Sequence, residues 1–176
     1  TTEANKIGAI VGDLAGAEEM FALKDLMTRL GSANVDARQD GAVFDPSWGR
    51  ASYLFNATIA GIEEADALLI VGANPRREAA VLNARIRKRW RQGNFPIALI
   101  GEKVDLTYTY DYLGAGAETL AGLGQSKFAE AFKAAKKPLI IVGAGVFARK
   151  DGAALAALAA KAAADFGAVS DGWNGF

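Results

Sequence analysis

The chain has 176 residues, of which 51% are hydrophobic, and its 20 basic and 20 acidic side chains give a formal net charge of zero. It contains no cysteine and no histidine, which excludes disulfides and catalysis by Cys–His or Ser–His pairs and removes the usual ligands of structural zinc and iron–sulfur clusters. The balanced charge provides no overall field that would favour nucleic acid or anionic lipid.

The first forty residues have the pattern of a strand–helix–strand unit. Residues 7–12 form a short apolar run that ends in glycine, and apolar residues at helical spacing follow over 20–30. Gly31 is a natural stop for that helix, and residues 33–37 could form a second strand. The segment 38–61 shows no clear period, and an irregular connection of this length is often functional or docked on another surface.

A second strand–helix–strand unit follows. Residues 67–71 read as a buried strand, residues 78–92 as an amphipathic helix and residues 97–100 as the next strand. The loop that begins at Gly72 joins the first strand to the helix. Such a loop after a parallel strand lies where α/β sheets bind ligands.

The last third of the chain continues the alternation. Residues 104–112 alternate between apolar and polar side chains, which predicts a half-buried strand or an extended arm. Residues 118–135 look helical with a break around Gly122, and residues 139–142 form another buried strand. Asp151 is a good N-cap for an alanine-rich helix to about Phe166. Together the elements predict an α/β fold in which helices cover both faces of a parallel sheet.

A glycine-rich turn formally fits a dinucleotide fingerprint. Gly143, Gly145 and Ala148 have its spacing, and Asp165 follows about 20 residues later. The fingerprint requires a helix that opens at the glycines, whereas the Asp151 cap predicts a later helix start. Asp165 also falls at a helix end rather than after a second strand. A glycine-rich exit from a strand is the favoured interpretation.

The loop Gly72, Asn74, Pro75 and Arg76 is the second candidate site. It could bind a ligand at the end of its strand. Asn and Pro could equally turn the chain and start the next helix. The sequence leaves both interpretations open.

A basic run marks the next helix and its approach, and its face could be solvated, could dock an acidic partner or could hold an anion. Its members are Arg76, Arg77, Arg85, Arg87, Lys88, Arg89 and Arg91. Nucleic-acid binding would require interleaved exposed aromatic side chains, whereas Trp90 falls on the apolar side of this helix.

Two acidic clusters have simple explanations. Alternation places Asp105 and Asp111 on one side of their segment and the tyrosines on the other, as in ordinary amphipathic patterning. Glu63 and Glu64 are expected in a short surface turn. Neither cluster favours acid–base catalysis.

Five stretches together resemble one family, the large iron–sulfur subunit of respiratory complex I, the NADH:quinone oxidoreductase. They are Tyr53–Asp66, Leu69–Arg76, Asn83–Lys88, Ile100–Gly101 and Val104–Gly114. The resemblance implies a segment from the C-terminal part of that subunit, downstream of its cysteine-rich region. The start at Thr1 and the stop at Phe176 are expected to be cut ends of a longer protein.

That part of the subunit is similar in fold to the molybdopterin oxidoreductases, which implies a three-layer, Rossmann-like parallel sheet. In those enzymes a Gly-x-Asn-Pro loop contacts a pterin dinucleotide, and Gly72, Asn74 and Pro75 match it. Glu102 and Lys103 stand where that family has an Asp-Pro-Arg motif. Ala37, which is followed by Arg38, stands near the position of the metal ligand. The resemblance therefore implies a lost cofactor and a retained scaffold.

The resemblance also implies an organisation and a role. Residues 1–40 and 136–176 would share one sheet, and residues 41–135 would form an inserted lobe. The segment would have no catalytic activity and no cofactor of its own and would pack against other domains of its subunit and against peripheral-arm subunits of complex I. It would lie on the cytoplasmic or matrix side of the membrane. A residual nucleotide or pterin-dinucleotide domain is the alternative, and an independent Rossmann-type enzyme is disfavoured.

Overall fold

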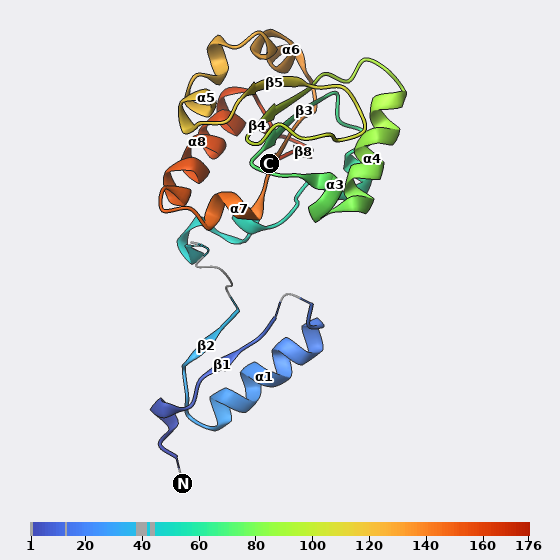
Figure 1. Ribbon diagram of the computed structural model, residues 1–176. Helices are drawn as coiled ribbons and strands as arrows, with labels where there is room; N and C mark the ends of the chain where they lie inside the picture. Colours follow the sequence, from blue (N-terminus) through green and yellow to red (C-terminus); the bar gives the residue numbers. More distant parts are fainter. Residues whose placement is uncertain (1, 13, 38–41, 43–44) are drawn as a thin grey trace. The chain divides into compact units, whose positions relative to one another are not determined.

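The computed structural model describes residues 2–12, 14–37, 42 and 45–176 (Figure 1). The chain forms two compact units, Thr1–Gly41 and Ala42–Phe176, called unit 1 and unit 2 below. Each is described by itself. None of the described helices is both long enough and apolar enough to cross a membrane.

Unit 1 is the predicted strand–helix–strand element. A 3-10 turn at Ala4–Lys6 precedes strand β1 (Ala9–Ile10). Helix α1 (Ala17–Arg29) connects β1 to strand β2 (Val35–Asp36), and the two strands pair in parallel. Gly31 ends the helix with a φ of 75°, a conformation that glycine adopts without steric cost. The predicted helix stop is therefore confirmed.

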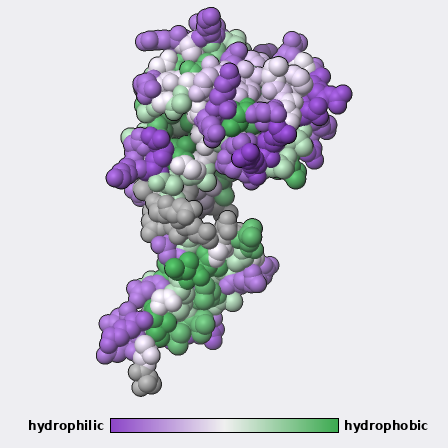
Figure 2. Space-filling model, in the orientation of Figure 1, coloured by the Kyte–Doolittle hydropathy of each residue, from purple (hydrophilic) through white to green (hydrophobic). Residues whose placement is uncertain are grey.

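Apolar side chains remain at the surface of unit 1. Met27 is the one hydrophobic side chain that is buried among its described residues. Figure 2 shows apolar colouring gathered on this part of the molecule. The exposed apolar residues are Ile10, Leu14, Met20, Phe21, Leu26, Leu30 and Val35.

Unit 2 is built on a parallel sheet of four strands in the order β5-β4-β3-β6. A short antiparallel pair, β7 with β8, lies near the C-terminus. The strands are β3 (Ala67–Val71), β4 (Ile97–Ile100), β5 (Asp111–Gly114), β6 (Pro138–Val142), β7 (Val169–Ser170) and β8 (Trp173–Asn174). The helices are α2 (Thr58–Gly61), α3 (Pro75–Glu78), α4 (Ala80–Arg91), α5 (Ala117–Ala121), α6 (Phe128–Ala134), α7 (Ala144–Phe147) and α8 (Gly152–Asp165), with 3-10 turns at Pro46–Trp48, Arg50–Tyr53 and Leu123–Gln125.

Alternate residues of the sheet point to two hydrophobic clusters, one on each face. Leu69 and Ile100 pack with α5, α6 and α8 on one face, and Leu68 and Leu99 pack with α4 on the other (Figure 1). Strands β3 and β4 have apolar residues at every position because both faces are buried. The predicted α/β fold with a helix-covered parallel sheet is confirmed.

A single carboxylate holds the start of two neighbouring strands. The oxygens of Asp66, just before β3, accept the backbone N–H groups of Lys136 at 2.7 Å and Lys137 at 2.8 Å, just before β6. The two strands then pair from Ala67 with Pro138 onward.

Strand β6 pairs with β3, so residues 136–176 lie in unit 2 together with 42–135. The predicted lobes, with 1–40 and 136–176 in one sheet, stay a prediction. For residues 104–112 the sequence left open a strand or an extended arm, and the strand does not form over 104–110. Thr107 has a φ of 71°, which breaks an extended backbone, and β5 begins only at Asp111.

Candidate functional site

The carboxyl ends of the strands of unit 2 surround a crevice of about 600 Å³. It is bordered by residues that follow β3, β4 and β6 and by the start of α5, and these residues include Gly72, Gly101, Gly116, Gly145 and Arg149. The chain moves from β3 to β4 and β5 on one side and returns to β6 on the other. Open α/β sheets bind ligands at such a reversal of strand order.

Two glycines at the ends of β3 and β6 are required by close packing. A Cβ atom on Gly72 would lie 2.4 Å from the Cγ2 of Val146, and Gly72 has a φ of 59°. A Cβ atom on Gly143 would lie 2.1 Å from the carbonyl oxygen of Gly72. The ends of β3 and β6 therefore touch backbone to backbone, and the glycines are explained without a ligand.

The dinucleotide-like turn departs from its prediction in one respect. Helix α7 opens immediately after Gly143, so the prediction that no helix starts before Asp151 is wrong. This helix has only four residues, and the long helix α8 begins at Gly152. Asp151 does not cap α8 with its side chain, because that carboxylate accepts two hydrogen bonds from Arg149 at 2.7 and 2.8 Å. This contact raises the pKa of Arg149 and lowers that of Asp151.

The Asn74 loop starts a helix, as one of its two interpretations predicts. Pro75 is the first residue of α3, a position where its missing N–H is not needed. The backbone N–H of Asn74 donates to the carboxylate of Glu78. The side-chain oxygen of Asn74 is buried and has no hydrogen-bond partner among the described residues. An unpaired buried acceptor costs about 1–3 kcal/mol, so this atom could accept a bond from a ligand.

Arg76 is engaged within the chain. Its guanidinium pairs with the carboxylate of Asp105 and lies 3.3 Å from the backbone oxygen of the same residue. The N–H of Thr107 and the charge of Arg76 lower the pKa of Asp105. Of the four predicted site residues, Gly72 lines the crevice, whereas Asn74, Pro75 and Arg76 do not.

Much of the basic run also binds groups of its own unit. Glu63, expected only in a surface turn, pairs with both Arg85 and Lys88 of α4, and these two contacts lower its pKa. Arg89 donates to the oxygen of Ala65 at 2.8 Å, and Arg87 donates to the oxygen of Thr107 at 3.2 Å. These contacts hold helix α4 to the segments on either side of it. The interpretation of the basic run as a face that contacts only solvent therefore applies to part of the run.

Sequence reasoning missed the buried polar contact that holds the 104–110 segment. The hydroxyl of Tyr108 donates to the Asn83 side-chain oxygen at 2.8 Å, and the Asn83 amide donates to the oxygen of Leu106 at 3.2 Å. Asn83 on α4 is buried, and burial raises the pKa of Tyr108. An asparagine on the apolar side of a helix was the signal that could have revealed this contact.

Comparison with known proteins gives a consistent family. The chain matches the family model described as molybdopterin oxidoreductase over residues 1–176. It is 46% identical over 173 residues to the G subunit of the NADH-quinone oxidoreductase of Rickettsia felis, which covers 97% of this chain and 26% of that protein. It is 44% identical over 175 residues to the mitochondrial NADH-ubiquinone oxidoreductase 78 kDa subunit of Candida albicans, covering 97% of this chain and 24% of that protein. The chain thus spans about a quarter of the length of these relatives.

Proposed function

The chain belongs to the molybdopterin oxidoreductase family, and from that premise we propose that it is a non-catalytic scaffold segment of the large iron–sulfur subunit of respiratory NADH:quinone oxidoreductase. Its role is to pack beside other domains of that subunit and beside neighbouring peripheral-arm subunits, so that the distances between electron carriers stay fixed. The subunit would lie on the cytoplasmic or matrix side of the membrane. The identity to the Rickettsia felis and Candida albicans subunits over nearly the whole chain supports this proposal.

The observation that carries the proposal is the internal use of the family's ligand-contacting loop. Gly72 packs against Val146, Pro75 is buried at the start of α3, and Arg76 binds Asp105. These contacts stabilise the fold of unit 2. They leave the buried side-chain oxygen of Asn74 without a hydrogen-bond partner among the described residues.

Three features of this chain argue against a bound pterin dinucleotide. Asn74 and Arg76 lie outside the walls of the crevice, and the exposed Glu102 brings a negative charge to its border. The position expected for a metal ligand holds Ala37, whose side chain has no donor atom, and Arg38 lies outside the described residues. We therefore derive no reaction step at this site and expect no cofactor in the segment.

Core mutations in the full-length subunit test the scaffold role. Phe132→Ala, which opens a cavity in unit 2, should reduce the amount of assembled complex, measured by native electrophoresis. NADH oxidation per assembled complex should stay unchanged. Arg76→Ala is the matched control at the loop and should leave both quantities near the wild-type values. Normal assembly with a large loss of turnover per complex would refute a purely structural role.

The docking interpretation of the basic face has its own test. Arg87 and Arg91 are exposed on α4, and Arg91 makes no ion pair with any residue in the described part of the chain. Charge reversal at both positions should weaken assembly if an acidic neighbour binds this face. Unchanged assembly and activity would reject that docking surface. The scaffold proposal would then be tested by the core variant Phe132→Ala alone.

A residual nucleotide or pterin-dinucleotide domain remains the second candidate, and the unpaired oxygen of Asn74 favours it. Titration with GDP, NADH or molybdopterin guanine dinucleotide tests it. Micromolar binding that disappears in Asn74→Ala would support this candidate. Absence of binding to all three compounds would eliminate it.

A further inference from the structure

The outer edge of β6 presents backbone groups that point away from β3. The N–H of Gly143 donates to the oxygen of Val71 at 2.8 Å, so alternate residues of β6 face β3. Ile140 and Val142 therefore face the outer edge. The N–H of Ile140 donates to the oxygen of Gly175 at 2.7 Å, whereas the N–H of Val142 has no partner within the described ranges. An edge with free backbone groups is a template for another strand.

The C-terminal residues already begin such a pairing. The indole N–H of Trp173 donates to the oxygen of Pro138 at 2.9 Å, and Gly175 bonds Ile140 two residues further along β6. Residues 173–175 therefore run in the same direction as β6. Pro138 stands at the first position of this edge strand, where its missing N–H breaks no ladder bond.

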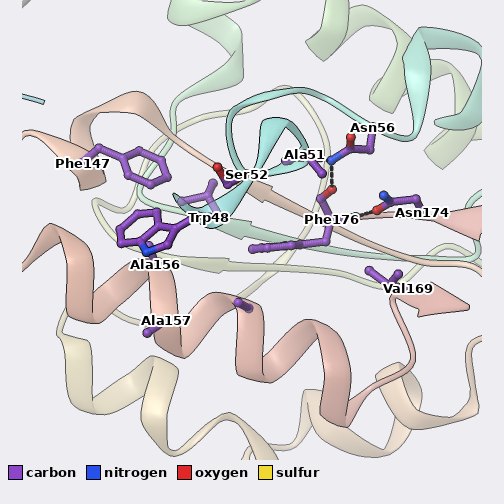
Figure 3. A pocket seen from close by; sticks show the side chains of 12 residues that line it. Trp48, Ala51, Ser52, Asn56, Phe147, Ala156, Ala157, Val169, Asn174 and Phe176 are labelled. Atoms are coloured by element: carbon purple, nitrogen blue, oxygen red, sulfur yellow. Dashed lines mark hydrogen bonds between the residues drawn. The ribbon is translucent and has the colours of Figure 1, made fainter. Parts of the chain in front are cut away.

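An apolar pocket of about 620 Å³ lies beside this edge. Its walls include Trp48, Val142, Phe147 and Phe176. Figure 3 shows Trp48, Phe147 and Phe176 above the face of α8 that carries Ala156 and Ala157. Val169 and Ala160 complete the apolar lining, and both are exposed. A pocket of this kind accepts an apolar side chain from a strand that lies on the free edge.

We propose that an extended segment of the same subunit adds to the outer edge of β6 as a parallel strand and places an apolar side chain in this pocket. The proposal rests on the proposed function, because it requires a longer polypeptide. The curated relatives provide one, since this chain spans only 24–26% of their length. The added strand follows the line that residues 173–175 establish, with Val142 as hydrogen-bond donor and Ile140 as acceptor.

A second copy of the chain fits this edge less well. Two β6 strands related by a twofold axis would pair in antiparallel fashion. The direction of residues 173–175 along β6 instead starts a parallel ladder. The edge is therefore assigned to the same polypeptide.

Hydrogen–deuterium exchange of the full-length subunit tests the proposal. The Val142 amide should exchange about 100-fold more slowly than an unprotected amide, which corresponds to a strand hydrogen bond of moderate local stability. Ala160→Arg, which fills the pocket with a charged side chain, should remove most of that protection. Ala154→Arg is the matched control, because Ala154 is exposed on α8 and does not line the pocket. The Gly143 amide should stay protected in all three proteins and reports that the sheet is folded.

Three results would overturn the proposal. One is fast exchange at Val142 in the wild-type subunit, and another is protection that survives Ala160→Arg. The third is protection that falls on dilution, which would assign the edge to a second copy. Assembly and turnover of the complex are measured separately, so the proposed function can fail or hold independently of this edge.

Discussion

Units 1 and 2 start from the same local pattern and end with different degrees of burial. Each contains parallel strands joined through a helix. Unit 1 pairs two strands of two residues each and buries one hydrophobic side chain among its described residues, Met27. Unit 2 adds strands on both sides of β3 and buries both faces of its sheet.

The comparison teaches that a strand–helix–strand pattern predicts elements but not their stability. Unit 1 buries little apolar surface, so it gains little stabilisation from the hydrophobic effect. Phe21 on α1 is 72% exposed, whereas Phe132 on α6 is fully buried. The same residue type therefore contributes differently to the free energy of unfolding in the two units.

Paired alanine substitutions should show the largest effect. Phe132→Ala removes a ring that lies 5.1 Å from Phe128 and 5.2 Å from Phe166, and it should lower the free energy of unfolding by about 3–5 kcal/mol. Phe21→Ala should change it by no more than about 0.5 kcal/mol. Urea unfolding followed by far-UV circular dichroism measures both, because helices of both units contribute to that signal, whereas all three tryptophans lie in unit 2. Equal losses of unfolding free energy in the two variants would contradict the difference in burial between Phe132 and Phe21. Phe132→Leu replaces the alanine variant if that variant does not fold.

Glycine substitutions should give the next largest effect. Gly143→Ala forces a Cβ atom against the Gly72 backbone and should destabilise unit 2 by about 1–3 kcal/mol. Gly8 is the counterpart in unit 1, where a Cβ atom would meet only ordinary contacts at 3.8 Å and beyond. Gly145→Ala has open space and lies in helix α7, so it should be neutral or stabilising by up to about 1 kcal/mol. Thermal unfolding of the three variants checks this order, and a Gly145→Ala cost equal to that of Gly143→Ala would contradict it.

Buried hydroxyl groups should differ between the units by a smaller amount. Tyr108→Phe leaves the Asn83 oxygen without its donor and should cost about 1–3 kcal/mol. Ser32→Ala in unit 1 removes the bond to the oxygen of Ile7, which still accepts from Asn34, and the weak bond from the backbone N–H of Asn34 at 3.3 Å, and should cost about 1 kcal/mol. Chemical unfolding of both variants measures the difference.

The same tyrosine makes stability depend on alkaline pH. Burial raises the pKa of Tyr108, so the unfolded chain releases this proton at a lower pH than the folded chain. The contribution is complete below the ordinary value of 10.0 and is lost progressively as the pH rises above it. The wild-type protein should therefore lose stability above pH 10.0 more steeply than Tyr108→Phe. Identical slopes of unfolding free energy against pH would contradict a buried neutral hydroxyl.

The Arg76–Asp105 pair should give the smallest effect, because both groups are largely exposed. The N–H of Thr107 and the Arg76 charge lower the pKa of Asp105, so their contribution is present above the ordinary value of 3.8 and is lost as the pH falls below it. The unfolding midpoints of wild type and Asp105→Asn should differ slightly at neutral pH and converge below pH 3.8. A difference that grows in acid would reverse the sign of this contribution.

The sequence predicted strands best where both faces are buried. The bounds of β3 and β4 agree with the predicted 67–71 and 97–100, because a continuous apolar run has one natural place in a covered parallel sheet. Over 104–110 the alternation predicted the burial of Leu106 and Tyr108 correctly, whereas the strand, one of its two alternatives, does not form. Alternate burial there comes from side-chain anchors to α4, so the pattern did not require a ladder.

The candidate site was predictable only in position. A loop after β3 was expected at the ligand-binding edge, and Gly72 does line the crevice there. The pairing of Arg76 with Asp105 joins residues 29 positions apart, and the approach of Val146 to Gly72 depends on the placement of β6 beside β3. Such contacts follow from strand order, which periodicity in a single sequence does not specify.

Asp66 determines which residues of β3 and β6 face each other. Its two oxygens receive two consecutive amides 70 and 71 positions away, and a shift by one residue would leave one amide unpaired and exchange the two hydrophobic faces of β6. Asparagine has only one acceptor oxygen and could not replace it fully. Because this alignment closes a loop of about 70 residues, the pairing of β3 with β6 is a slow, nonlocal event in folding. Helices between the two strands can form first, and the carboxylate then selects the correct alignment when the strands meet.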